Sequence, residues 1–192
     1  ITASGEESLI NFIPSGYDKY SILSDGRHVF LNNSNELVIW DADAESFNTA
    51  QLGSSYWYMQ TEGNNIYVAN NNGIFSVDMT NISANLIELE EIVVFDGISM
   101  NGYEFSLENG SILYGVSTDS GTRQVWLLED SENDPELLYS GDNCCYRPML
   151  VNGNVYRLDS WGYHQIIDGE VVNQVNYSGD EQSLNKDQKM VM

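Results

Sequence analysis

The feature that most constrains the fold is a short unit that occurs four times along the 192-residue chain. Each copy has an apolar stretch, a turn centred on glycine, a second apolar stretch, a polar loop and a third apolar stretch. A unit this short cannot bury its own apolar face, so the copies must pack against one another. The turn glycines are Gly26, Gly63, Gly110 and Gly153.

Each copy is expected to form four β-strands around its turn. The predicted first strands are Tyr20–Ser24, Tyr56–Gln60, Tyr103–Leu107 and Cys145–Leu150, and the second are Val29–Leu31, Ile66–Val68, Ile112–Tyr114 and Val155–Leu158. The predicted third strands are Leu37–Trp40, Ile74–Val77, Gln124–Leu128 and Gln165–Ile167, and the fourth are Ala50–Leu52, Leu86–Leu89, Glu136–Tyr139 and Val171–Val175. Ile92–Asn101 is expected to be an insert with an extra edge strand. Consecutive apolar positions indicate sheets covered on both faces.

Four strands in a unit of roughly 40–45 residues are typical of a propeller blade. The predicted fold is therefore all-β, a β-propeller or partial propeller of about four four-stranded blades. A β-sandwich or barrel of hairpins is the alternative. In this interpretation residues 1–16 form an N-terminal segment with a possible ring-closing strand, residues 17–178 form the four blade repeats, and residues 179–192 form a polar tail.

The first copy carries a more specific pattern. It reads Ser24-Asp-Gly-Arg-His-Val-Phe-Leu31 and then Leu37-Val-Ile-Trp-Asp-Ala-Asp-Ala44. This resembles the TolB-type propeller repeat, in which a Ser-(Pro)-Asp-Gly turn and an apolar strand precede an apolar strand that ends in Asp-Ala-Asp. The second copy lacks the second Asp, and the last two copies keep only the glycine turn and the strands. The resemblance implies a propeller fold and no particular function.

The charge of the chain limits its partners. Seven Lys and Arg residues stand against 29 Asp and Glu residues, for a net charge of −22. Such a charge repels nucleic acids and anionic membranes. No apolar run approaches the ~20 residues that span a bilayer, so membrane insertion is not expected. The small, polar residues of Ile1–Ser8 are similar to the linker behind an export signal, which predicts an extracytoplasmic location: periplasmic, cell-surface or secreted.

One acidic stretch has the spacing of a metal site. Asp41, Asp43 and Glu45 alternate after a predicted strand, which suits Ca²⁺ chelation from a loop. An EF-hand would need Gly at its sixth position and Glu at its twelfth, where this chain has Ser46 and Leu52. The alternative is that the Asp side chains bind turn amides. No other cofactor is expected.

Cys144 and Cys145 are the two cysteines and are adjacent in sequence. Neighbouring Cα atoms are about 3.8 Å apart, so a vicinal disulfide would be strained. Two reduced thiols on opposite faces of a strand are the preferred interpretation, and the vicinal disulfide is the alternative.

Aromatic residues are the best candidates for a binding surface. Trp57 and Tyr58 lie in a Tyr-Trp-Tyr run whose rings point to opposite faces, and Trp161 and Tyr163 lie in a predicted hairpin connection. Such rings stack on sugars or pack against a protein partner. Packing between blades is the alternative role.

No catalytic motif stands out in the sequence: it has no Gly-x-Ser-x-Gly, no His-Glu-x-x-His and no phosphate loop. We therefore expect a non-enzymatic, exported binding module whose loops on one propeller face bind a protein or glycan. One alternative is a glycan-processing enzyme with carboxylates at the ring centre. Another is a structural segment of an assembly or adhesin, completed by a further chain or by oligomerisation.

Overall fold

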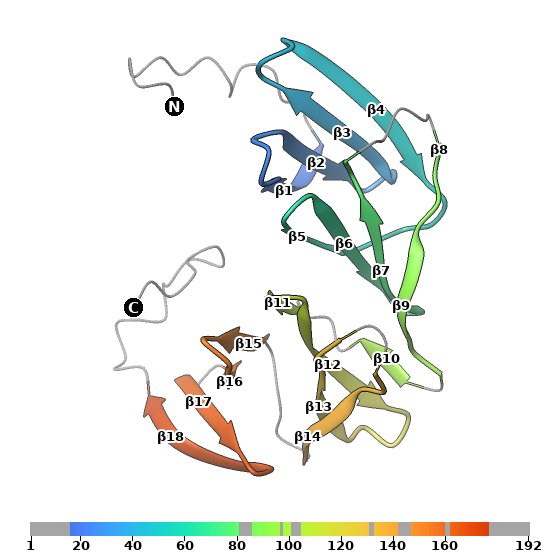
Figure 1. Ribbon diagram of the computed structural model, residues 1–192. Coiled ribbons are helices and arrows are strands. Elements are labelled where there is room, and N and C mark those ends of the chain that lie inside the picture. Colours follow the sequence, from blue (N-terminus) through green and yellow to red (C-terminus); the bar gives the residue numbers. More distant parts are fainter. Residues whose placement is uncertain are drawn as a thin grey trace. The chain divides into compact units, whose positions relative to one another are not determined.

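The computed structural model describes residues 16–80, 86–96, 98–100, 105–130, 133–141, 147–159 and 162–176. All regular elements in these ranges are β-strands, which form four sheets (Figure 1). No described segment is a helix long and apolar enough to cross a membrane. The chain divides into two compact units, unit 1 (Ile1–Val94) and unit 2 (Phe95–Met192), and each holds two sheets. The predicted all-β fold with four blade-like sheets is confirmed.

Unit 1 contains the first and second sheets. In the first sheet four antiparallel strands follow the chain order, and a short fifth strand lies parallel to β4. Its strands are β1 (Tyr17–Ile22), β2 (His28–Asn32), β3 (Glu36–Asp41), β4 (Ser46–Leu52) and β8 (Leu86–Ile87). The antiparallel second sheet consists of β5 (Tyr58–Glu62), β6 (Asn65–Asn70), β7 (Gly73–Asp78) and β9 (Glu90–Val94).

Unit 2 contains the third and fourth sheets. In the third sheet two short strands pair with opposite ends of the long strand β12. Its strands are β10 (Ile98–Met100), β11 (Ser106–Glu108), β12 (Ser111–Thr118), β13 (Arg123–Leu128) and β14 (Glu136–Gly141). The fourth sheet consists of β15 (Arg147–Val151), β16 (Asn154–Asp159), β17 (Gly162–Ile167) and β18 (Glu170–Asn176).

The expected fourth strand of the second copy was wrong. Leu86 and Ile87 pair with Gln51 and Leu52 of the first sheet, and Ile87 is buried in the core of unit 1. The outer strand of the second sheet is instead Glu90–Val94, which falls largely in the stretch that we expected to be an insert. Leu86 and Ile87 do form a strand, as their apolar side chains predicted, but this strand belongs to the first sheet and not to the second.

The repeated turn glycines have the predicted role. Gly26, Gly63, Gly110 and Gly153 all have positive φ, between 59° and 89°. Asn109 and Asn152 also have positive φ, at 53° and 51°, so each forms with its glycine the pair of left-handed residues that a tight hairpin requires. The repeat therefore marks the same hairpin in each sheet.

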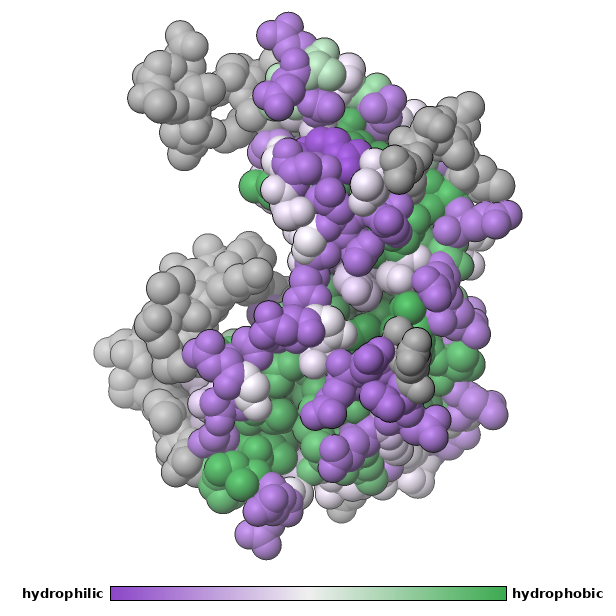
Figure 2. All heavy atoms as spheres, in the orientation of Figure 1, coloured by the Kyte–Doolittle hydropathy of each residue, from purple (hydrophilic) through white to green (hydrophobic). Residues whose placement is uncertain are grey.

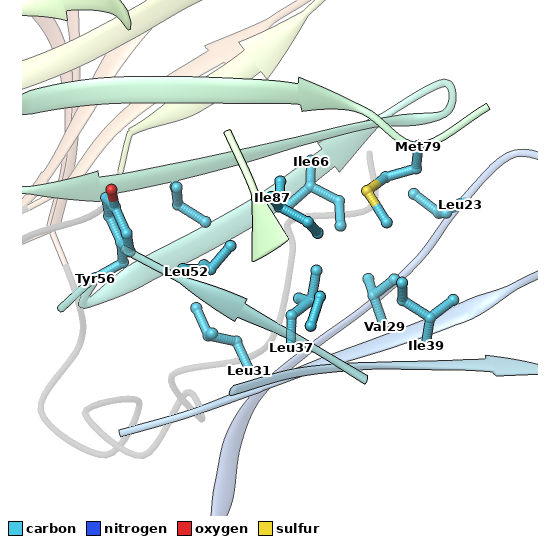
Figure 3. Close-up of a cluster of buried hydrophobic side chains, with 12 residues drawn as sticks. Leu23, Val29, Leu31, Leu37, Ile39, Leu52, Tyr56, Ile66, Met79 and Ile87 are labelled. Carbon is cyan, nitrogen blue, oxygen red and sulfur yellow. The ribbon is translucent and has the colours of Figure 1, made fainter. Parts of the chain in front are cut away.

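The two sheets of unit 1 pack face to face around an apolar core (Figure 3). Strands β2 and β3 contribute Val29, Leu31, Leu37 and Ile39, and the second sheet contributes Ile66 and Val68. The other buried members are Leu23, Ala50, Leu52, Tyr56, Met79 and Ile87. Neighbouring copies of the repeat thus cover each other's apolar faces, as predicted.

The sheets of unit 2 meet in a more polar interface. Leu113 and Val125 of the third sheet pack with Leu150, Val155 and Ile166 of the fourth. Two basic side chains of the fourth sheet are also buried, since Arg157 is 8% exposed and His164 is 3% exposed. The Arg157 guanidinium lies 5.3 Å from the centroid of the Tyr139 ring, which belongs to the third sheet. A cation–π contact therefore joins these two sheets.

In both units the glycine turn of one sheet is held by the preceding sheet. The backbone N–H of Ser24 donates to the carbonyl of Gly63 over 2.9 Å, and the Ser24 hydroxyl donates to the Asn64 side chain over 2.7 Å. In unit 2 the Glu108 carboxylate accepts hydrogen bonds from the N–H groups of Asn152 and Gly153, over 2.6 and 2.7 Å. We call these two sets of contacts the turn clasps.

Candidate functional site

The side of the first sheet that points away from the second sheet carries a continuous set of large side chains. Side chains alternate across a strand, so the neighbours of the core residues Val29, Leu37 and Ile39 point to this opposite side. We call it the aromatic face. Its members are Tyr20, Ile22, His28, Phe30, Val38, Trp40 and Phe47.

One row of the aromatic face crosses the four antiparallel strands. Ile22 pairs with His28, His28 with Trp40, and Trp40 with Phe47. The two ends of the row are open to solvent, because Ile22 is 49% exposed and Phe47 is 43% exposed. The Trp40 and Phe47 rings are 4.4 Å apart between centroids. The row thus presents apolar surface on β1 and on β4.

Tyr20 anchors the next row and is 53% exposed. Its ring stacks on Phe30 and on His28, with centroid distances of 5.1 and 5.8 Å. The Tyr20 hydroxyl and His28 Nδ1 are 2.8 Å apart. Burial raises the pKa of Tyr20 and lowers the pKa of His28, which favours the neutral form of both groups. The tautomer of the neutral imidazole decides which of the two atoms donates the hydrogen bond. The exposed ring is therefore held in place by two stacking contacts and a hydrogen bond.

An acidic turn borders this face between β3 and β4. The turn contains Asp41, Asp43 and Glu45, and the latter two are exposed. Asp41 Oδ1 accepts hydrogen bonds from the backbone N–H groups of Asp43 and Ala44, each over 3.0 Å. Within the described ranges, no three or more His, Cys, Asp or Glu side chains gather in a way that could hold a metal ion. Asp41 thus caps the turn through two backbone N–H groups, and the calcium site at Asp41, Asp43 and Glu45 stays a prediction.

The predicted binding residues are distributed over both units. Trp57, which precedes β5, is 45% exposed, while Tyr58 and Tyr163 are half-buried in β5 and β17. The backbone N–H of Trp57 donates to the carbonyl of Ala69. Trp161 and the cysteine pair Cys144 and Cys145 lie outside the described residues, as does the possible ring-closing strand of the N-terminal segment. Trp57 has the exposure that a binding residue needs.

Sequence reasoning missed the aromatic face. Its signal was present in β1, where Tyr20 and Ile22 alternate with the polar residues Lys19 and Ser21. In β2 and β3 apolar residues occupy consecutive positions, a pattern that predicted coverage on both sides. Phe30 and Val38 bear this out, since each is only 4% exposed, and the exposed part of the aromatic face lies on β1 and β4. The exposure of Ile22 and Phe47 became evident only when the strands were paired.

The fold belongs to the propeller class, and solved structures support this assignment. No family model and no curated protein matches the chain. A luciferin-regenerating enzyme matches with a TM-score of 0.56 at 9% identity, over 84% of this chain and 60% of that one. The β-propeller domain of Cps50 (Swd1) from Myceliophteria thermophila matches with a TM-score of 0.52 at 12% identity, over 72% of this chain and 46% of that one. The N-terminal domain of Nup159 matches with a TM-score of 0.52 at 10% identity, over 81% and 46%.

These similarities show a fold and no activity. The chain spans 60% or less of the length of each of these three proteins. At such low identity they support a propeller without distinguishing the TolB-type repeat from other propeller repeats. One of them is an enzyme by name, so fold alone does not decide whether this chain has an activity.

Proposed function

We propose that this chain is a non-enzymatic, protein-binding module of the propeller class and that the aromatic face is its contact surface. The observation that carries the proposal is the exposure of Tyr20, Ile22 and Phe47 on one side of one sheet. The sequence pointed to loops on one propeller face, whereas this proposal places the contact on the side of a sheet. Large apolar side chains that stay exposed on one side of a sheet are typical of an interaction site.

The energetics support binding through this face. Complete burial of a side chain of this size contributes about 1.5–3 kcal/mol, so covering three half-exposed side chains contributes a few kcal/mol. Tyr20 is already held by Phe30 and His28, so little rotamer freedom is lost when a partner covers it. Aromatic side chains are also enriched among the residues that dominate protein interfaces.

Site-specific photo-crosslinking in an extract of the producing organism tests this function. A crosslinker placed at Thr49, an exposed residue of β4 next to the aromatic face, is expected to capture one defined partner. Tyr20→Ser and Phe47→Ser are expected to abolish that capture. Leu137→Ser, which alters an equally exposed residue of unit 2, is the matched control and is expected to leave it intact. Equal capture by all variants would refute the assignment of the face.

A glycan ligand is the second candidate, and exposed Trp57 supports it. Indole rings stack on sugar faces, so Trp57→Ala is expected to abolish binding to a glycan array if sugar is the ligand. Retention of glycan binding in Trp57→Ala would exclude this ring as the sugar platform. The aromatic-face variants separate this candidate from protein binding, because Trp57 lies outside that face.

We also propose an extracytoplasmic location. Its support is the high acidity of the chain, which suits solubility in salty surroundings. Fractionation of the producing cells is expected to recover the protein outside the cytoplasm. Recovery with cytoplasmic markers would contradict this.

A further inference from the structure

We propose that the partner of the aromatic face is a cationic protein segment that alternates arginine with apolar residues. This inference rests on the proposed function and adds the chemistry of the partner. Two observations carry it: a row across the first sheet whose end residues, Ile22 and Phe47, are exposed, and an acidic turn beside the Phe47 end of that row.

The acidic turn is connected directly to the apolar row. Trp40 immediately precedes Asp41 at the end of β3, and Phe47 follows Glu45 by two residues at the start of β4. Asp43 and Glu45 are exposed, whereas the Asp41 carboxylate accepts turn amides. A segment that covers Trp40 and Phe47 therefore ends beside two solvated carboxylates.

The basic residues of unit 1 already bind other groups. Lys19 and Arg27 are the only Lys or Arg residues in the sequence from Ile1 to Val94. Lys19 pairs with Asp18 over 2.9 Å, and Arg27 pairs with Asp25 over 2.7 Å and donates to the carbonyl of Met79. The unit therefore carries a strong excess of negative charge, and an incoming cation is favoured at the acidic turn.

Arginine suits both parts of the surface. Its planar guanidinium binds carboxylates through paired hydrogen bonds and also stacks on aromatic rings. The exposed ring of Tyr20 and the Trp40–Phe47 pair offer stacking surfaces, and Asp43 and Glu45 offer carboxylates. The apolar residues of the segment cover Ile22 and Phe47.

A second copy of this chain is a poorer occupant. Each copy carries a net charge of −22, and the acidic turn of one copy would approach the surface of another copy with the same sign of charge. Like charges brought together at an interface oppose association. Charge complementarity thus selects a cationic partner over self-association.

The test measures binding of fluorescein-labelled peptides to the full chain by fluorescence anisotropy. The probe is an octapeptide of alternating Arg and Leu. One control peptide alternates Arg with Ser and keeps the charge, and the other alternates Glu with Leu and keeps the apolar residues. The Arg-Leu peptide is expected to bind at least about tenfold more tightly than either control, because only it matches both the apolar row and the acidic turn.

Variants of the chain locate the binding. Ile22→Ser combined with Phe47→Ser is expected to weaken binding of the Arg-Leu peptide about tenfold. Asp43→Asn combined with Glu45→Gln is expected to weaken it several-fold at low ionic strength and to reduce its salt dependence. Leu137→Ser and Glu136→Gln alter an exposed apolar residue and an exposed acid of unit 2, and are expected to change nothing. Unchanged thermal midpoints show that the variants still fold.

Each contrary result has a definite meaning. The attraction is nonspecific, and the inference is wrong, if the Arg-Ser peptide binds as tightly as the Arg-Leu peptide and Glu136→Gln weakens binding as much as Asp43→Asn with Glu45→Gln. If the peptides do not bind but sedimentation shows a dimer that Ile22→Ser with Phe47→Ser dissociates, the occupant is a second copy. That result overturns the cationic partner and leaves the protein-binding function standing. If the aromatic-face variants change neither peptide binding nor photo-crosslinking, the proposed function fails as well.

Discussion

Two sheets pack against each other in each unit, but the side chains between the sheets differ between unit 1 and unit 2. In unit 1 the sheets meet through a large apolar cluster, in which Leu31, Leu37 and Val68 are completely buried. Among the described residues of unit 2, a smaller apolar cluster is accompanied by buried Arg157 and His164, and the Arg157 guanidinium lies over the Tyr139 ring. The turn clasp also differs, since neutral groups hold the turn in unit 1 and a carboxylate holds it in unit 2. Both units share the strand–turn pattern, whereas the side chains between their sheets are apolar in unit 1 and partly basic in unit 2.

Hydrophilic residues cover much of the surface shown in Figure 2. This agrees with a sequence that has 29 acidic and seven basic residues. Large apolar side chains are exposed against this polar background both on the aromatic face and outside it, at Trp57, Val94, Leu137 and Ile167.

The largest expected effect is in the apolar core of unit 1. Leu37→Ala removes a completely buried side chain and is expected to lower the free energy of unfolding by about 3 kcal/mol. Leu113→Ala is the matched variant in unit 2 and is expected to cost less, because the smaller cluster around it collapses more easily. Urea unfolding with a probe in each unit measures both values. A larger loss for Leu113→Ala would break the contrast between the two cores.

The next effect concerns the cation–π contact of unit 2. Tyr139→Leu keeps an apolar side chain but removes the aromatic face beneath Arg157, and is expected to cost about 1–2 kcal/mol of stability. Tyr139→Phe keeps that face and is the control, with an expected loss of less than half as much. Thermal unfolding measures both losses of stability. An equal loss in Tyr139→Leu and Tyr139→Phe would show that the hydroxyl, rather than the ring, stabilises this unit.

Variants of the two turn clasps are expected to lose less stability, and the loss is expected to differ between the clasps. Glu108→Gln replaces a charged acceptor of two backbone hydrogen bonds with a neutral one, and is expected to cost about 1 kcal/mol. Ser24→Ala removes one neutral hydrogen bond in unit 1 while the backbone bond to Gly63 remains, and is expected to cost about 0.5 kcal/mol. Denaturant unfolding compares the two variants. A Ser24→Ala loss equal to the Glu108→Gln loss would remove the distinction between the clasps.

The smallest effect appears only at alkaline pH. Burial, followed by the hydrogen bond to Glu36, raises the pKa of Tyr17 in unit 1 from 10.0 to about 12, and burial alone raises the pKa of Tyr114 in unit 2 to about 12. Because the folded state holds these protons more tightly than the unfolded state, the resulting stability is fully present below pH 10. It is lost as the pH rises through about 12.

Phenylalanine variants test this pH dependence. Tyr17→Phe and Tyr114→Phe are each expected to reduce the fall in stability between pH 10 and about 12. The ultraviolet absorbance of the phenolate should show correspondingly fewer late-titrating tyrosines. If either variant leaves both curves unchanged, that tyrosine does not carry the shift.

Local chemistry made the hairpins predictable. The turn glycines were identified from sequence because positive φ is a property of the residue and its immediate neighbours. The second and third strands of each copy were also located closely, since each follows its turn at short range. The fourth strand of the second copy was wrong because the choice between Leu86–Ile87 and Glu90–Val94 depends on partners distant in sequence.

Of the candidate site, the sequence pointed to exposed Trp57 and to the acidic turn, but not to the aromatic face. The alternation of polar and apolar residues along β1 showed that this strand has two different sides. Nothing in the local sequence indicates which of the two sides a second sheet covers. The sequence by itself determined a repeated strand–turn unit, an all-β fold and a strongly acidic surface, because these follow from residue type and short-range spacing. Only the tertiary structure decided that Val29 and Leu37 are covered by the second sheet while Tyr20, Ile22 and Phe47 keep contact with solvent. Which side of a strand is buried depends on how the two sheets pack, so the sequence of that strand alone does not determine it.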